Sequence, residues 1–246
     1  MRVLLLLACL CGAPVHAAPL VADLSEHQIA IRSTFTGADI LLFGAIDVSE
    51  DEDADVIVVV RGPDKPVTVR KKSKIGPIWA NADAVEFARA PGFYAVASTR
   101  PIGLIAPSTL LDRQEIGLNH LPLTPRDAEI DKAELGEFRR ALIRNRVTAE
   151  LYAEQAGAIR FVGPGLFRTT IRLPANVPVG TYRVQAFLLI DEKVEGAHFS
   201  PLFIDKTGFE RQVFTLATTM PFVYGIIAVM IAVLAGWAAG AIFRKN

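Results

Sequence analysis

The sequence predicts a mainly β protein: an immunoglobulin-like β-sandwich with a helical insertion, followed by one C-terminal transmembrane helix. Short runs of β-branched and aromatic residues with alternating polarity recur along the chain, as in strands buried on one face. Helical periodicity interrupts them near residues 105–156. The chain lacks the β-α-β alternation that would favour a parallel sheet. A long uncharged apolar segment follows near the C-terminus, which predicts the membrane helix.

Residues 1–17 are typical of a secretory signal peptide. Arg2 precedes an apolar core, and Val15-His16-Ala17 provides a cleavage position. A lipoprotein signal ending at Cys9 is the weaker alternative, because its apolar core would be very short. Cys9 and Cys11 are the only cysteines. We therefore expect the exported chain to lack disulfides, thiolate metal sites and a cysteine nucleophile.

Residues 18–207 are expected to form one periplasmic domain with a sizeable core. Of the 26 basic and 26 acidic residues, three basic ones lie outside Ala18–Thr219 and no acidic one does, which leaves this segment a net charge of about −3. The weakly acidic balance and the predicted export argue against a nucleic-acid partner.

The segment before the insertion predicts several strands. His27–Ile46 alternates around Thr36-Gly37-Ala38-Asp39 and is expected to form a β-hairpin. Val56–Val60 is a continuous β-branched run typical of a central strand, and Pro66–Ile75 alternates in a way that favours pairing with it. Three further short strands are expected at Ile78-Trp79, Ala84 to Phe87 and Phe93 to Ala97.

The insertion is expected to contain one long helix. Asp131 followed by Glu134 resembles a capping box, and apolar residues recur on one face as far as Gln155. Arginines and interspersed glutamates opposite much of this face favour a surface helix with ion pairs over a membrane-binding one. A shorter helical turn is expected around Thr109–Glu115. The arginines are Arg139, Arg140, Arg144 and Arg146.

Strands are expected to return after the insertion. Tyr182 opens one of them after the turn-rich link Pro174–Gly180, which resembles the tyrosine corner of immunoglobulin-like sandwiches. Too few strands lie on either side of the helix to form a stable domain alone, so one sandwich is favoured. The expected strands are Ala158–Phe161, Phe167–Leu173, Thr181–Ile190 and Val194–Ile204.

Residues 220–243 predict a transmembrane helix. No charged side chain interrupts this segment, and at about 1.5 Å per residue it reaches roughly 36 Å, enough for a hydrocarbon core of about 30 Å. Arg244 and Lys245 follow, which favours a cytoplasmic tail at 244–246. The predicted location is the bacterial inner membrane, with 208–219 as a juxtamembrane linker.

The predicted membrane helix carries a stripe of small residues at successive intervals of four: Ala228, Ala232, Gly236 and Gly240. Such spacing lets a second helix approach closely, which a simple tether does not require. The stripe predicts helix packing against a membrane partner. Anchorage in the lipid bilayer alone is the alternative.

A basic stretch forms the candidate anion site of the domain. Its cations suit a small oxyanion or lipid phosphates. Because side chains alternate along a strand, at most half of them are expected on one face. The alternative is a solvated hairpin edge that lysines protect from aggregation. The candidate residues are Arg70, Lys71, Lys72, Lys74, Trp79 and Asn81.

No pattern in the sequence predicts catalysis or a resident metal, so we expect no enzyme activity and no cofactor. No serine lies in a G-x-S-x-G elbow. The alternating aspartates from Asp51 to Asp55 resemble a calcium loop, but Val56 occupies the position of its glycine, which favours a solvated acidic loop. The three histidines of the exported chain show no metal-ligand spacing, namely His27, His120 and His198.

A set of short motifs is collectively specific. They are Phe35-Thr36-Gly37-Ala38 with Phe43-Gly44, Arg61-Gly62-Pro63, Gly76 to Asn81, Phe93-Tyr94 with Ser98 to Pro101, and Lys206 to Arg211. Through them, nearly the whole exported chain resembles a family of alphaproteobacterial single-pass transmembrane proteins, Alph-Pro-TM. The resemblance implies a similar architecture and, through gene neighbourhood, a partner of the sulfite-exporter type. It implies no catalytic residues.

The expected function is that of a non-enzymatic, membrane-anchored periplasmic accessory protein. Its expected partner is a membrane transporter, such as an exporter of sulfite or another small anion. Two alternatives remain open: a periplasmic small-anion-binding module, and an envelope structural or assembly protein.

Overall fold

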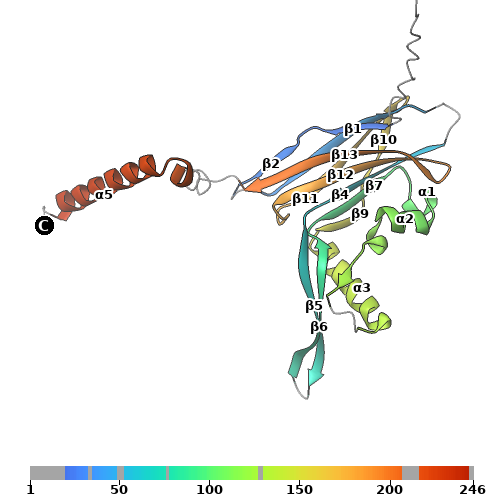
Figure 1. The fold of residues 1–246 in the computed structure, drawn as a ribbon, viewed down its shortest axis with the longest axis horizontal. Coiled ribbons are helices and arrows are strands. Elements are labelled where there is room, and N and C mark those ends of the chain that lie inside the picture. The colour runs from blue at the N-terminus through green and yellow to red at the C-terminus, as the bar shows by residue number, and fades with distance from the viewer. Residues whose placement is uncertain are drawn as a thin grey trace, which may run out of the picture.

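A computed structural model describes residues 20–32, 35–48, 53–75, 78–126, 130–206 and 216–243. Its strands form three sheets, with helices inserted between two of the strands (Figure 1). The predicted signal peptide, the tail at 244–246 and most of the predicted linker lie outside the described residues. The mainly β fold with a helical insertion is thereby confirmed.

The first sheet has four antiparallel strands in the order β1-β3-β11-β10. Strands β1, β3 and β11 alternate between buried and exposed residues, because one face packs inward and the other meets solvent. The edge strand β10 is exposed along its length. At Gly44 an added Cβ would lie 2.5 Å from the Phe167 ring, so glycine is required there. The strands are β1 (Leu20–Leu24), β3 (Gly37–Ile46), β11 (Leu166–Pro174) and β10 (Arg160–Gly163).

The second sheet has six strands in the order β2-β13-β12-β4-β7-β9. The two edge strands, β2 and β9, run parallel to their neighbours, while the other pairs are antiparallel. The strands are β2 (Gln28–Ile31), β13 (Lys193–Lys206), β12 (Gly180–Ile190), β4 (Ala54–Arg61), β7 (Tyr94–Ser98) and β9 (Tyr152–Ala158).

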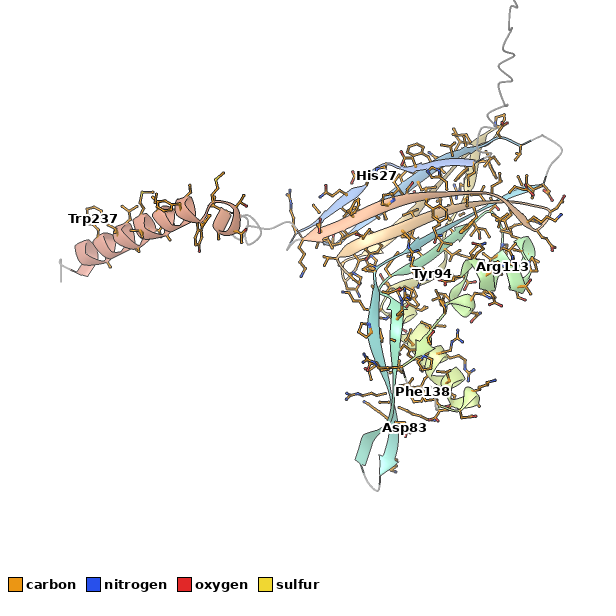
Figure 2. All side chains as sticks on the ribbon, viewed as in Figure 1. His27, Asp83, Tyr94, Arg113, Phe138 and Trp237 are labelled. Atoms are coloured by element: carbon orange, nitrogen blue, oxygen red, sulfur yellow. The ribbon has the colours of Figure 1, made fainter. Side chains whose placement is uncertain are left out.

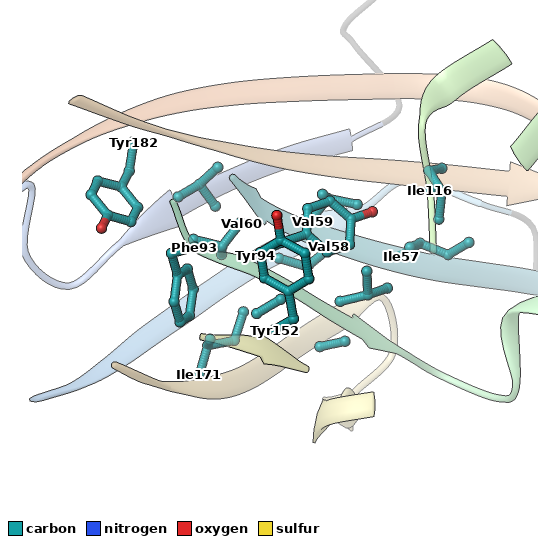
Figure 3. Close-up of a cluster of buried hydrophobic side chains, with 14 of the residues drawn as sticks. Ile57, Val58, Val59, Val60, Phe93, Tyr94, Ile116, Tyr152, Ile171 and Tyr182 are labelled. Atoms are coloured by element: carbon teal, nitrogen blue, oxygen red, sulfur yellow. The ribbon is translucent and has the colours of Figure 1, made fainter. Parts of the chain in front are cut away.

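The hydrophobic core lies between these two sheets and continues under the helical insertion. Strand β1 contacts β13, and β11 contacts β9. Strand β4 is buried along both faces, as predicted for a central strand. Figure 3 shows Ile57 near Ile116 of the insertion. The rings of Tyr94 and Tyr152 pack edge to face, with their centroids 6.2 Å apart. Each large buried side chain contributes about 1.5–3 kcal/mol.

The helical insertion joins β7 to β9 and contacts β9 through α3 and η1. The Tyr94 hydroxyl fastens it, donating to the Glu115 carbonyl at 2.7 Å and accepting from the Gly117 amide at 2.8 Å. The predicted turn near Thr109 is confirmed as α2. The elements are α1 (Ile102–Ile105), α2 (Ser108–Gln114), the 3₁₀ turn η1 (Leu118–His120), β8 (Thr124–Pro125) and α3 (Lys132–Thr148).

The third sheet, β5-β6-β8, projects from the other two as a long hairpin arm with α3 beside it (Figure 1). Strand β5 (Asp64–Ile75) pairs with β6 (Ile78–Pro91) throughout its length. The predicted pairing of Pro66–Ile75 with Val56–Val60 is therefore wrong. The short strands predicted at Ile78-Trp79 and Ala84 to Phe87 are parts of one long strand.

The predicted hairpin over His27–Ile46 is also wrong. Strand β2 pairs in parallel with β13, whereas β3 pairs with β1 and β11 in the other sheet. The chain crosses between sheets where a tight turn was expected, and alternating polarity alone does not distinguish the two arrangements.

Helix α3 begins as predicted, with the Asp131 carboxylate accepting from the Ala133 amide at 3.1 Å. It ends at Thr148, well before the predicted Gln155. The Glu150 amide donates to the Val147 carbonyl, and the Leu151 amide donates to the Arg146 carbonyl, both at 2.9 Å. These two backbone bonds form a Schellman motif. Glu150 has φ 59°, a conformation that usually selects glycine. A glutamate at this position is not a recognisable stop signal, which explains why the helix end was missed.

The strands predicted after the insertion are confirmed as β10 to β13, and Tyr182 does bond back along the chain. Its hydroxyl donates to the Pro178 carbonyl at 2.5 Å, as in a tyrosine corner. The immunoglobulin-like arrangement itself is not established, since both edges of the six-stranded sheet carry parallel strands.

Helix α5 (Pro221–Phe243) occupies the segment predicted to cross the membrane. Its side chains are described without a break as far as Trp237, and within the described residues no helix is long and apolar enough to cross a membrane.

Candidate functional site

A groove between β5 and α3 gathers much of the positive charge that the sequence singled out. It has a volume of about 500 Å³, and Figure 2 shows Phe138 of α3 beside the hairpin arm. We call this surface the basic groove. Its lining residues are Val69, Arg70, Lys71, Lys72, Glu137, Phe138, Arg140, Ala141 and Arg144.

The helix side of the basic groove follows from residue spacing on α3. Glu137, Arg140, Ala141 and Arg144 are three or four positions apart, which places them along one helical face. Phe138 is buried beside that face, while both arginines are exposed. Burial of Phe138 therefore orients the helix so that its arginines line the groove.

The strand side supplies three consecutive cations, Arg70, Lys71 and Lys72. Simple alternation predicted that neighbouring side chains would point to opposite faces. The pairing register shifts between Lys71, opposite Asp83, and Lys72, opposite Asn81. The extra residue of this bulge belongs to β6, so the bulge does not interrupt the alternation along β5. Arg70, Lys71 and Lys72 all line the groove, and the register shift does not explain why.

One ion pair crosses the basic groove. The Lys71 ammonium lies 2.9 Å from a carboxylate oxygen of Glu137, and both side chains are about half exposed. This hydrogen bond raises the pKa of Lys71 and lowers the pKa of Glu137, and nearby Arg140 lowers the latter further. The groove thus has five cations and one carboxylate.

The remaining candidate anion residues are not part of the described groove. Lys74 is exposed farther along β5, opposite Trp79 in the pairing register, and does not line it. The side chains of Trp79 and Asn81 lie outside the described residues. Arg140 and Arg144 were not predicted as site residues, although their spacing from Glu137 was a usable signal.

The acidic loop has a structural explanation at its described end. Asp55 is 6% exposed and accepts a bond from the Thr99 hydroxyl at 2.6 Å. The Arg100 guanidinium donates to the same carboxylate, with its Nε at 2.8 Å from one oxygen. Asp51 lies outside the described residues.

The histidines do not converge in the described structure. His27 lies 2.9 Å from Asp23, and His120 lies 2.6 Å from Asp112. His198 belongs to β13. Among the described residues, no three metal-ligating side chains come together.

The small-residue stripe lies on α5. Ala228, Ala232 and Gly236 fall within the helix, and a Cβ added at Gly236 would meet no atom within 4 Å. Large apolar side chains elsewhere on the helix are also exposed, among them Phe222 at 84% and Trp237 at 74% (Figure 2). Gly240 belongs to the helix, but its surroundings lie outside the described residues.

Comparison with known proteins identifies one family. The model of the family described as "Putative transmembrane protein (Alph_Pro_TM)" matches residues 19–245. No curated protein matches the chain.

Proposed function

We propose a function for this chain as a member of the Alph_Pro_TM family, to which it belongs because the family model covers residues 19–245. The chain is a membrane-anchored, non-enzymatic accessory protein. Helix α5 holds it in the bacterial inner membrane, and the β domain lies in the periplasm. Its partner is a membrane transporter that exports sulfite or a related small anion.

The observation that carries this proposal is the character of α5. Counted over its whole sequence, including the residues beyond Trp237 that lie partly outside the described side chains, it has 23 residues and no charged side chain. At about 1.5 Å per residue these extend roughly 35 Å. A hydrocarbon core is about 30 Å thick. The described part exposes apolar side chains from Phe222 to Trp237, and exposing such surface to water is unfavourable by about 25 cal/mol per Å². Lipid or another helix would cover it.

The stripe of small residues favours a protein partner over lipid alone. Ala232 and Gly236 leave one side of α5 nearly flat, whereas Met230 and Leu234 on the opposite side are large and exposed. In a bilayer, close backbone approach at small residues is a main source of attraction between helices.

The direction of insertion rests on the sequence. Arg244 and Lys245 follow α5, and basic residues favour the cytoplasmic side. The β domain precedes α5 and is then periplasmic. The choice of a sulfite-exporter-type partner follows from what the resemblance to this family implies.

The test is co-purification of the full chain with a co-expressed sulfite-exporter-type protein from the same genome, in mild detergent. The wild-type chain is expected to retain the transporter, and the double variant Ala232→Leu/Gly236→Leu to lose most of it. The matched control Met230→Phe/Leu234→Phe enlarges the opposite side and is expected to retain it. Recovery of monomer or homodimer alone, or equal retention by the two double variants, would refute the proposal.

A further inference from the structure

We propose that the basic groove between β5 and α3 is a binding site for a small tetrahedral oxyanion, of the phosphate or sulfate class. This inference goes beyond the accessory function and does not depend on α5. It rests on the arrangement of charge in the groove, the pairing state of its cations and the shape of its lining.

The first step is the convergence of five cations from two elements. Arg70, Lys71 and Lys72 come from β5, and Arg140 and Arg144 from α3. Like charges held beside one groove repel one another, and their summed potential attracts an anion. A dianionic ligand between strand and helix would relieve this repulsion.

The second step is the pairing of these cations. Elsewhere in the domain Arg61, Arg100 and Arg126 each form an ion pair with a carboxylate. In the basic groove only Lys71 does so. Over the described ranges, the other four cations make no ion pair with a protein carboxylate. They remain available to a ligand.

The third step is the position of Glu137. Its carboxylate oxygen, 2.9 Å from the Lys71 ammonium, marks a place where the groove already holds an anionic oxygen. A bound oxyanion would take over this contact and displace the Glu137 side chain, which is 56% exposed and free to move. Glu137 is therefore a competitor that weakens binding.

The fourth step is the lining. Val69 and Phe138 are buried, and together with Ala141 they give the groove an apolar wall. A wall of low polarity strengthens charge-assisted hydrogen bonds made beside it. The planar guanidinium groups of Arg140 and Arg144 each suit two oxygens of a tetrahedral anion. The volume of the groove, about 500 Å³, exceeds the volume of a single phosphate ion. Size therefore does not restrict the ligand to one compound.

The experiment is calorimetric titration of the full chain with sodium phosphate and sodium sulfate, in a detergent free of phosphate groups. We expect saturable binding that weakens as salt increases. The double variant Arg140→Gln/Arg144→Gln removes two exposed cations and is expected to lower the affinity at least tenfold. Loss of a single hydrogen bond to a charged group already weakens binding by about that factor.

The matched control is Arg160→Gln/Arg168→Gln. These arginines are exposed and directly opposite each other on β10 and β11, so the charge change is identical and the groove is untouched. Glu137→Gln is expected to raise the affinity several-fold. The inference is overturned if the wild-type chain binds neither anion, or if the control lowers the affinity as much as the groove variant. Thermal unfolding of each variant checks that the fold is intact.

A second arm distinguishes a free anion from a lipid headgroup. The titration is repeated in nanodiscs of phosphatidylglycerol and of phosphatidylcholine. Equal affinity in both assigns the groove to a free anion. If binding of the free anion is lost only in phosphatidylglycerol nanodiscs, the groove is assigned to the phosphate of an anionic lipid, which has the same chemistry. No step uses the transporter, so this inference and the accessory function fail independently.

Discussion

The Asp55 carboxylate shows how single residues explain features that the sequence left open. A run of acids suggested either a cation loop or a solvated loop, but Asp55 instead closes the end of β4 against Arg100 and Thr99. Residue types alone did not reveal these partners, since Arg100 is 45 positions away along the chain.

Asp55→Asn is expected to destabilise the domain by about 1–3 kcal/mol, because it replaces charge-assisted hydrogen bonds of a buried acceptor with weaker ones. Urea denaturation of the variant would measure the loss. Asp39→Asn, on an exposed position of β3, is the control and is expected to change little. Equal effects at both positions would contradict this role for Asp55.

The buried tyrosines predict a specific response to alkaline pH. Burial raises the pKa of Tyr94, Tyr152 and Tyr182 above the ordinary value of about 10. The neutral form is favoured in the folded state, so their contribution to stability is present below about pH 10 and is lost as the pH rises above it.

The measurement is tyrosine absorbance as a function of pH in folded and denatured protein. Of the four tyrosines, these three are expected to remain protonated in the folded domain when the denatured chain has already titrated. The free energy of unfolding should fall above about pH 10. Coinciding titration curves would contradict the burial of these hydroxyl groups.

At the scale of elements, the existence of strands and helices was more predictable than their boundaries and partners. Alternation located β4, β11, β12 and β13, and the N-cap located the start of α3. Alternation did not reveal that β2 and β3 lie in different sheets, because the local polarity pattern is the same whether the chain turns back or crosses to another sheet. Strand β1 was missed, since it lies close to the predicted signal peptide.

The end of α3 provides a prediction at this scale. Glu150 holds a left-handed conformation that costs a non-glycine residue about 1 kcal/mol. Glu150→Gly is therefore expected to stabilise the domain by up to about 1 kcal/mol, whereas Thr148→Gly, in the last helical position, should destabilise it. Thermal unfolding compares the two, and destabilisation by Glu150→Gly would contradict the described helix end.

The candidate groove depended on tertiary structure. The sequence identified its strand side through Arg70, Lys71 and Lys72, but it also implied that alternation would divide them. The packing of α3 against β5 was needed to assemble the site. This packing does not follow from residue types, and it explains why Arg140 and Arg144 join the groove.

At the scale of the whole molecule, two surfaces have separate roles in the proposed account. Helix α5 makes the membrane contact, and the basic groove on the projecting arm takes an anion. The β domain between them supplies rigidity through a core shared by two sheets.

The most direct test of the central claim, that α5 packs against a membrane partner, is site-specific photo-crosslinking in intact membranes. A photoreactive residue is placed at Ala232 on the small-residue stripe or at Leu234 on the opposite side of the helix. An adduct with the transporter is expected from position 232, and mainly lipid adducts are expected from position 234. Absence of a protein adduct from position 232, or equal adducts from both positions, would contradict this claim.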